Sequence, residues 1–567
     1  MKATFIFLLC FLALNFLVFI PNWLIGSISK IDYPKKSFFN DTPYFILKKI
    51  LYQRYHDDFL RLIFELQVLV FLMLLFNGLF VPYFKMGLII TVMLSFVYVT
   101  YIAVIIKVFK KAPMLINDID FMRTGFMVYK RKAPIAVFSV LAALLIVLLL
   151  SWFLVNLLVE YSFQIENKDY LLVLFLLSIL LSLFSIKKVH YDLYHSCVSF
   201  SIVKHFYYNV KKCNVLMNSL KSLNESLPYE YIKSIKLKKK PNIIFIFLES
   251  YGSFALSSEE YGLNFKKKLT EINESLIQNN WEVASTLSES PVSSGGSWLS
   301  HSSILFGAKV KDIAAHEVIF SHTDYVTKLE SMPKYLSQLG YKTTMTSTLS
   351  YDKNEVDWQK IKNAYPFDDL MLYDDFDYEG EDVPIFGDRF SIPDEYSLNF
   401  AYNKLSKKAP FFLTVSTINS HYNYISPIKP LKHWKDYNTT KIPLTDGLKK
   451  NNLKNYFSAM HYQFDYIHNF LLNYNHEDSI VVLIGDHQPP FITPSNIDKT
   501  TPIHVLSKDQ KFINAFKTVN FNEGLVPIKH SQTHESFFSK LLYALNKVYG
   551  EDAQKDLPIF EEGINLY

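Results

Sequence analysis

The sequence predicts a membrane domain of five helices followed by an α/β three-layer domain, and three observations support this fold class. Half of the 567 residues are apolar, and the excess is concentrated before about residue 186, where Leu, Phe, Ile and Val dominate. From residue 242 onward, short apolar runs alternate with stretches of helical periodicity. Three of those runs are typical of buried strands in a parallel sheet covered on both faces. We therefore expect a transmembrane domain over 1–186, a linker over 187–240 and a globular domain over 241–567.

The overall composition excludes several classes of protein. An aromatic content of 16% and a mean hydropathy of +0.11 exclude a disordered or fibrous chain. A net charge of +5, from 58 basic and 53 acidic residues, is too balanced to indicate nucleic-acid binding. The three cysteines are Cys10, Cys197 and Cys213. The globular domain therefore contains neither a disulfide framework nor a cysteine-based zinc site.

Five apolar stretches approach the roughly 20 residues that a helix needs to cross a bilayer. The first lacks a basic leading segment and a small-residue cleavage site before Pro21, so we interpret it as a retained helix rather than a cleaved signal. The predicted spans are approximately 3–21, 60–82, 87–107, 134–158 and 169–186.

Two lines of reasoning conflict over the orientation of these helices. The loop 107–133 carries seven Lys or Arg residues, whereas the loops near Lys85 and over 159–168 carry very few. The positive-inside rule would place loop 107–133, and with it the C-terminal domain, in the cytoplasm. The chemistry described below favours the opposite side of the membrane.

The segment 187–240 is basic and aromatic, and it ends in three lysines followed by Pro241. This pattern is typical of helices that lie in the interface against lipid headgroups. A solvated linker explains it equally well, so both interpretations stay open.

The globular domain begins with the clearest strand signals in the chain. Continuous runs of apolar, β-branched and aromatic residues predict buried strands, and a long helical pattern lies between two of them. The predicted strands are Asn242–Leu248, Pro410–Thr417 and Ser479–Ile484, and the predicted helix covers 449–472.

Each predicted strand ends in polar residues that a core strand does not need. Glu249 follows the first strand, His421 closely follows the second, and Asp486 and His487 follow the third. Taken singly, Glu249 could cap a helix and Asp486-His487 could form a turn. Ligands collect at the carboxyl ends of strands in open α/β sheets, and oxygen and imidazole donors without thiolates suit Zn²⁺ or Mn²⁺. Together these residues predict a metal site.

A nucleophile is predicted in the serine-rich stretch 293–307. Gly295 and Gly296 allow a tight turn, and the apolar residues after Ser297 resemble the start of a helix. Ser297 would then lie at a helix N-terminus, where backbone N–H groups and the helix dipole favour an oxyanion. A divalent cation would lower the pKa of its hydroxyl. The alternative is a serine-rich loop that only caps the helix.

The order of these motifs resembles the sulfatase-like branch of the alkaline phosphatase superfamily. Within that branch, the N-terminal helices followed by this domain resemble the lipoteichoic acid synthase (phosphoglycerol transferase) and phosphoethanolamine transferase membrane enzymes, and the resemblance covers nearly the whole chain. It implies one divalent ion, Mn²⁺ or Zn²⁺, bound by Glu249, Ser297, Asp486 and His487. It also implies that Ser297 is the nucleophile and that His421 holds the substrate phosphate.

The sequence departs from these families in ways that bear on the function. The families normally carry threonine where Ser297 stands, which leaves Ser293 or Ser294 as alternative nucleophiles. The residues after Ser297 do not form a sulfatase formylglycine signature, so sulfate-ester hydrolysis is not expected. Phosphoethanolamine transferases carry disulfides in this domain, and their absence here favours a phosphoglycerol transferase.

Three further residues are candidate substrate-binding groups. Arg389 is a possible phosphate clamp. His530 and His534 resemble a late histidine motif of the transferases, although a capped surface helix would also explain them. Asp394 and Glu395 are expected to begin a helix.

The resemblance implies an enzyme of the bacterial cytoplasmic (inner) membrane, multi-pass, with an extracytoplasmic catalytic domain. Its donor would be a membrane phospholipid and its acceptor an envelope glycan or lipid. In this orientation, basic residues of loop 107–133 would hold anionic headgroups near the active site, each contributing on the order of 1 kcal/mol. The alternatives are a phosphoethanolamine transferase, a sulfatase-like hydrolase or phosphodiesterase, and a non-catalytic envelope assembly factor.

Overall fold

A computed structural model of the chain forms two compact units, Met1–Met217 and Asn218–Tyr567. The structure describes residues 2–29, 54–55, 61–76, 80–107, 113–115, 118–119, 134–187, 195–196, 199–221 and 235–565, with gaps in the last range at 311–315, 317–325, 327–328, 351–357, 386–388, 408–409, 423, 446–451, 495–496, 529 and 556.

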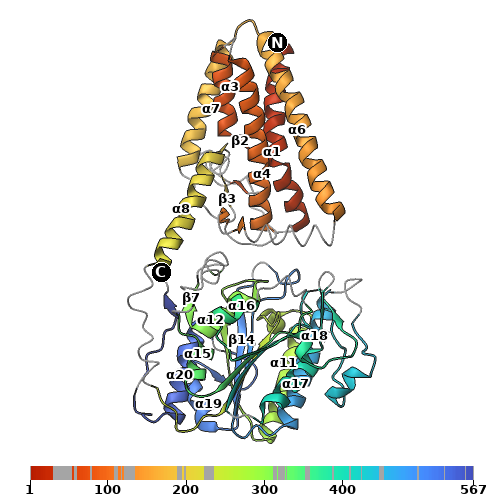
Figure 1. Ribbon diagram of the computed structural model, residues 1–567, viewed down its shortest axis with the longest axis vertical. Coiled ribbons are helices and arrows are strands. Elements are labelled where there is room, and N and C mark those ends of the chain that lie inside the picture. Colours follow the sequence, from red (N-terminus) through yellow and green to blue (C-terminus); the bar gives the residue numbers. More distant parts are fainter. Residues whose placement is uncertain are drawn as a thin grey trace. The chain divides into compact units, whose positions relative to one another are not determined.

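The first unit is built from apolar helices (Figure 1). Three of them are long and apolar enough to cross a membrane, over Lys2–Asn22, Val81–Ile105 and Phe138–Phe163, whereas Phe64–Leu75 and Asp169–Leu183 are shorter apolar helices. Three of the five expected membrane-spanning helices are therefore confirmed as long and apolar enough to cross a membrane, and the other two are shorter than that. The complete helices are α1 (Lys2–Ser29), α3 (Phe64–Leu75), α4 (Val81–Lys107), α6 (Pro134–Phe163) and α7 (Asp169–Lys187).

A helix also forms in the predicted linker. Helix α8 (Ile202–Lys221) begins where Glu65 accepts hydrogen bonds from the Ser201 hydroxyl and the Val203 backbone N–H. Its Phe206 and Tyr207 side chains are exposed, so aromatic residues of the basic, aromatic linker lie on the surface of this helix. Most of the basic residues of loop 107–133 lie outside the described residues.

The second unit is organised around a nine-stranded mixed sheet with the order β15-β6-β14-β13-β5-β12-β8-β9, and β16 pairs with β6. The three predicted strands are confirmed as β5 (Asn242–Leu248), β12 (Phe411–Ser416) and β13 (Ser479–Gly485), and they are parallel to one another. The other strands are β6 (Glu282–Glu289), β8 (Lys342–Thr346), β9 (Asp369–Met371), β14 (Thr500–Ser507), β15 (Asn522–Glu523) and β16 (His530–Thr533).

The three predicted strands are parallel as expected, but the sheet is not parallel throughout, because β14 departs from this pattern. This strand is antiparallel to both β13 and β6. A parallel neighbour needs a crossover connection, usually a helix, whereas the described residues between Gly485 and Thr500 form no helix, and the chain simply turns back.

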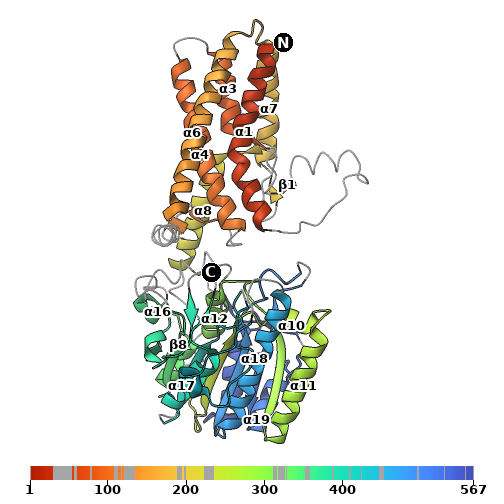
Figure 2. The ribbon, with the colours of Figure 1, turned by 90° about the vertical axis from the view of Figure 1, so that its right-hand side faces the viewer.

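Helices cover both faces of the sheet, which confirms the three-layer α/β architecture (Figures 1 and 2). In β5, Ile244 and Ile246 belong to the core that includes α11 and α18, whereas Phe245 and Phe247 contact Phe537 and His301 on the other face. One face is covered by α11 (Gly262–Gln278), α17 (Asp394–Leu405) and α18 (Asn452–Asn473), and the other by α12 (Ser297–Phe306), α15 (Met332–Gln338), α19 (Gln510–Lys517) and α20 (Ser536–Tyr549).

Helix α18 confirms the helix predicted over 449–472, and α17 begins at Asp394 as expected. The remaining elements are short: α10 (Phe254–Ser257), α16 (Trp358–Ala364), the 3-10 helices Tyr373–Asp375 and Trp434–Asn438, and the strands β1 (Arg54–Tyr55), β2 (Leu62–Ile63), β3 (His195–Ser196), β4 (Ser199–Phe200), β7 (Ala308–Lys309), β10 (Val383–Pro384), β11 (Phe390–Ser391) and β17 (Ile564–Asn565).

Candidate active site

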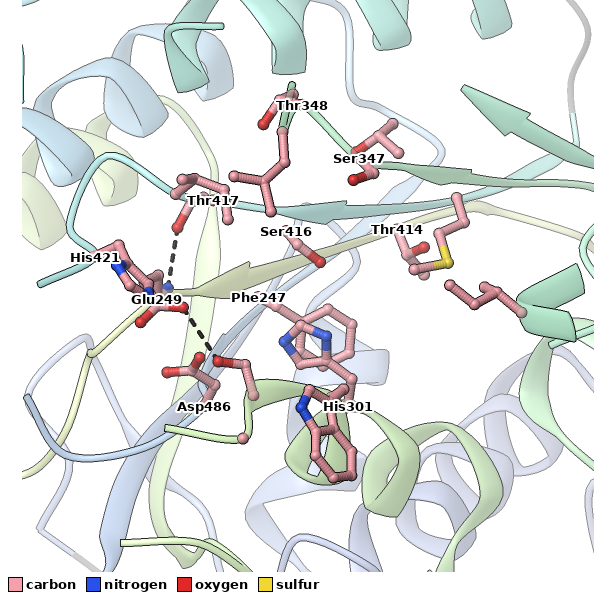
Figure 3. A pocket seen from close by; sticks show the side chains of 18 of the residues that line it. Phe247, Glu249, His301, Ser347, Thr348, Thr414, Ser416, Thr417, His421 and Asp486 are labelled. Carbon is pink, nitrogen blue, oxygen red and sulfur yellow. Dashed lines mark hydrogen bonds between the residues drawn. The ribbon is translucent and has the colours of Figure 1, made fainter. Parts of the chain in front are cut away.

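The ends of the parallel strands bring together a group of side chains suited to bind a metal ion. Glu249 follows β5, and Asp486 and His487 follow β13, the strand that pairs with β5. All three are buried, and their ligand atoms lie within 4.8 Å of one another. Figure 3 shows Glu249 and Asp486 facing the same space. The shared carboxyl edge of the sheet therefore gathers these residues, as the sequence predicts.

Ser297 joins this group from the first position of α12. Its Oγ lies 3.2 Å from Glu249 Oε2 and 3.2 Å from His487 Nε2. His487 Nε2 in turn lies 3.5 Å from Glu249 Oε1 and 3.6 Å from Asp486 Oδ2. A hydroxyl, an imidazole and two carboxylates thus surround one small volume.

The donor atoms of this group fit a divalent cation. Asp486 Oδ1 accepts hydrogen bonds from the backbone N–H groups of Ser250 (2.8 Å) and His487 (2.7 Å), whereas its buried Oδ2 accepts none from any described residue. The Nδ1 of His487 lies 2.9 Å from the Gln488 carbonyl, which can only accept a hydrogen bond, so Nδ1 is the donor there and Nε2 is the ring nitrogen available to a cation. Such oxygen and nitrogen donors without a thiolate suit Zn²⁺ or Mn²⁺.

The electrostatics of the group point to the same conclusion. Burial, reinforced by the charge of Glu249, raises the pKa of Asp486 to about 7. Burial also raises the pKa of Glu249, but His487, His421 and hydrogen bonds outweigh it and bring that pKa below its usual value. For His487 burial lowers the pKa, and the two carboxylates raise it by more. A cation at this position would offset the repulsion between the two buried carboxylates.

Two glycines determine where Ser297 lies. Gly295 and Gly296 have φ angles of +67° and +76°, a left-handed conformation that residues with a Cβ rarely adopt. Helix α12 therefore begins abruptly at Ser297, next to the metal-binding group. Ser297 lines the adjoining cavity, whereas Ser293 and Ser294 are not among its described lining residues.

A network of buried hydrogen bonds holds the backbone of Glu249 in place. Its backbone N–H donates to Thr417 Oγ1 (3.0 Å), and its carbonyl accepts from Ser420 Oγ (2.7 Å). The amide of Gln463, from α18, donates to both hydroxyls at 2.8 and 2.7 Å. The next residue, Ser250, has a φ of +60°, so the backbone is strained at this strand end.

A cavity of about 630 Å³ opens beside the metal-binding group. His421 and Arg389 both line it, as do all four predicted metal-site residues. His421 Nδ1 lies 3.0 Å from the Tyr422 carbonyl, which leaves Nε2 for a ligand. Sequence reasoning thus placed six candidate residues around one cavity.

The two remaining candidates, His530 and His534, do not lie among the described lining residues of this cavity. His530 is exposed at the start of β16. His534 is fully buried, with Nδ1 3.0 Å from Ser288 Oγ and Nε2 3.1 Å from the Gly485 carbonyl. Strand β16 pairs with β6, two strands away from β13, and from there His534 supports the backbone at Gly485, just before Asp486.

Sequence reasoning missed two residues of the site. Gln463 lies in a helix far along the chain, and no local signal identifies it. His301 lines the cavity, and its ring packs against Phe247 in a tilted arrangement with 4.1 Å between the ring centroids. Because residues four apart share a helix face, the spacing from Ser297 could have indicated His301.

The family model described as Sulfatase matches residues 241–536, just over half of the chain. No curated protein matches the sequence.

Three solved structures illustrate what the chain is similar to. The lipoteichoic acid synthase LtaP from Listeria monocytogenes is 21% identical, with a TM-score of 0.36, and the match covers 51% of this chain and 71% of that one. The phosphoglycerol transferase GacH from Streptococcus pyogenes is 14% identical, with a TM-score of 0.37 and coverage of 61% and 85%. The C-terminal periplasmic domain of EptC from Escherichia coli is 15% identical, with a TM-score of 0.36 and coverage of 56% and 85%.

Proposed function

The chain belongs to the sulfatase family, and from this premise we propose that it is a membrane-bound, metal-dependent phosphotransferase. It moves a phospholipid headgroup, phosphoglycerol in the favoured case, to an envelope glycan or lipid through a phosphoserine intermediate. The observation that carries the proposal is the placement of the Ser297 hydroxyl at the N-terminus of α12, 3.2 Å from both Glu249 and His487.

Glu249, Ser297, Asp486 and His487 would hold one Zn²⁺ or Mn²⁺ ion. When bound, such an ion lowers the pKa of a hydroxyl and stabilises negative charge that develops on phosphoryl oxygens. Gln463 keeps Glu249 in place through the Thr417 and Ser420 hydroxyls, so helix α18 helps to position a candidate metal ligand.

The reaction proceeds in two halves at Ser297. In the first, its Oγ forms a bond to the donor phosphorus, the bond from phosphorus to the diacylglycerol oxygen breaks, and diacylglycerol leaves as an alcohol with the serine proton. In the second, the oxygen of an acceptor hydroxyl forms a bond to the phosphorus, the bond from phosphorus to Ser297 Oγ breaks, and the acceptor proton goes to Ser297 Oγ. His421 and Arg389 hold the phosphate from the cavity wall, and the N–H groups at the start of α12 favour its negative charge.

Turnover of labelled phosphatidylglycerol tests the proposal directly. The full chain, reconstituted in vesicles with Zn²⁺ or Mn²⁺, is expected to release diacylglycerol, and the Ser297→Ala variant is expected to release none. Chelation of the ion should stop the wild-type reaction. If label moved only to water, the chain would be a hydrolase. Absence of any turnover with either metal would favour an assembly factor and contradict the proposal.

We place the catalytic domain outside the cytoplasm, because the phospholipid donor and the envelope acceptor meet there. The positive-inside rule, applied to the seven Lys or Arg residues of loop 107–133, opposes this placement, so the orientation needs a direct test. Alkaline phosphatase fused after Tyr567 is expected to be active. A cytoplasm-only fluorescent protein at the same position should stay dark, and the reverse result would overturn this orientation.

A further inference from the structure

His301 presents an unused imidazole to the cavity. It lies one turn after Ser297 on the same face of α12, and no described residue makes a hydrogen bond to either ring nitrogen. Its ring is fixed against Phe247 at an interplanar angle of 32° (Figure 3). Burial lowers the pKa of His301 to about 3, so at neutral pH the ring offers one N–H donor and one lone-pair acceptor.

Several residues with hydroxyl side chains line the same cavity, and we give the name hydroxyl wall to three of them: Thr414 and Ser416 from β12, and Ser347 directly after β8. Strands β12 and β8 pair in parallel, so their ends lie side by side. Figure 3 shows Thr414, Ser416 and Ser347 with Phe247 and His301 along the cavity. Because Thr414 pairs with Met345, the neighbouring Thr346 directs its side chain to the opposite face of the sheet and does not belong to this wall.

These groups share one chemical property. Each hydroxyl, like the neutral imidazole, can both donate and accept a hydrogen bond. Hydroxyl groups of a ligand match such partners, whereas an ammonium group only donates and is best bound by carboxylates. Among the described residues that line the cavity, the carboxylates are Glu249 and Asp486, and both belong to the metal-binding group.

We propose that His301 and the hydroxyl wall form the subsite that binds the hydroxyl groups of an uncharged, glycerol-like headgroup. The subsite selects this headgroup over one that ends in an ammonium. This inference rests on the proposed function, since the headgroup enters the cavity attached to the phosphate that Ser297 attacks. The hydroxyls of this wall are left without a matching partner when the ligand lacks a hydroxyl group, and unpaired polar groups are a strong source of discrimination.

The test compares the kcat/KM of the full chain for phosphatidylglycerol and phosphatidylethanolamine. The wild type is expected to prefer phosphatidylglycerol. The variant His301→Leu should lose roughly tenfold in kcat/KM for phosphatidylglycerol and change less than about twofold for phosphatidylethanolamine. His301→Asn, which keeps a donor and an acceptor, should recover most of the preference. His433→Leu, a histidine change at an exposed position outside the cavity lining, is the matched control.

Two further measurements keep the test decisive. Ser416→Ala, a small change at the end of β12, should shift the same ratio if His301→Leu fails to fold. Soluble glycerol phosphate should quench the fluorescence of Trp298 and Trp358, which line the cavity, more strongly than phosphoethanolamine does, and His301→Leu should abolish the difference.

The outcomes separate the two proposals. Equal losses for both donors in every variant, or a wild type that prefers phosphatidylethanolamine, would overturn the subsite and leave the phosphotransferase intact. A wild type that transfers neither headgroup would overturn the proposed function, and the subsite with it.

Discussion

Replacement of Ser297 by alanine is expected to reduce headgroup transfer by about 10⁴-fold or more, because no other group can form the bond to phosphorus. The fold should not change. The Ser297 side chain is half-buried at a helix start that Gly295 and Gly296 impose through their backbone, and its two hydrogen bonds go only to Glu249 and His487. Steady-state release of diacylglycerol and a thermal melt of the same sample measure the two effects.

The neighbouring serines provide matched controls for this prediction. Ser293→Ala and Ser294→Ala remove the same hydroxyl a few residues earlier and should retain near wild-type turnover. Mass spectrometry of a quenched reaction should find the headgroup phosphate on the peptide that contains Ser297, and fragmentation should assign it to that residue. An adduct on Ser293 or Ser294 would move the nucleophile and refute the assignment.

Replacement of Asp486 by alanine is expected to weaken binding of the divalent ion by more than about 100-fold. Loss of groups that merely support a ligand already costs about 10- to 100-fold, and Asp486 offers a buried oxygen that no described residue satisfies. Glu249→Ala should behave in the same way, since its carboxylate belongs to the same group. Elemental analysis of the purified full chain measures the bound metal.

Two variants sharpen this second prediction. Asp465→Ala removes a carboxylate on α18 that pairs with Lys268 of α11 at 2.6 Å, and this variant should retain the metal. His421→Ala should also retain the metal but bind phosphate weakly, because His421 lines the cavity and is not one of the grouped ligands. Full metal occupancy in Asp486→Ala would show that the ion binds elsewhere.

Local sequence patterns were sufficient to predict much of this site. The buried strands β5, β12 and β13 are continuous runs of mostly apolar residues, which indicates that both faces of each strand are covered. Each strand is followed by polar residues that a core strand does not need. Because the carboxyl ends of parallel strands share one edge, the order of these motifs already implies that Glu249, Asp486 and His487 meet. The two glycines before Ser297 indicate the helix start in the same local way.

Long-range packing settled what such patterns leave open. The antiparallel direction of β14 depends on a connection from β13 that contains no helix among the described residues. The number of membrane-spanning helices depends on helix lengths, which hydropathy defines only loosely. The burial of His534 depends on the pairing of β16 with β6, which no local pattern encodes.

The sequence by itself predicted the α/β fold class of the globular domain, the candidate metal-binding group and the candidate nucleophile, because each depends on local runs of residues or on residues adjacent to a strand end or a helix start. Only the tertiary structure showed that Gln463 supports Glu249 and that His301 faces the hydroxyl wall. Those contacts join side chains from different helices and strands. Hydrophobic periodicity can be seen in the sequence, whereas the partner of a buried hydrogen bond and the shape of a cavity depend on how the layers pack.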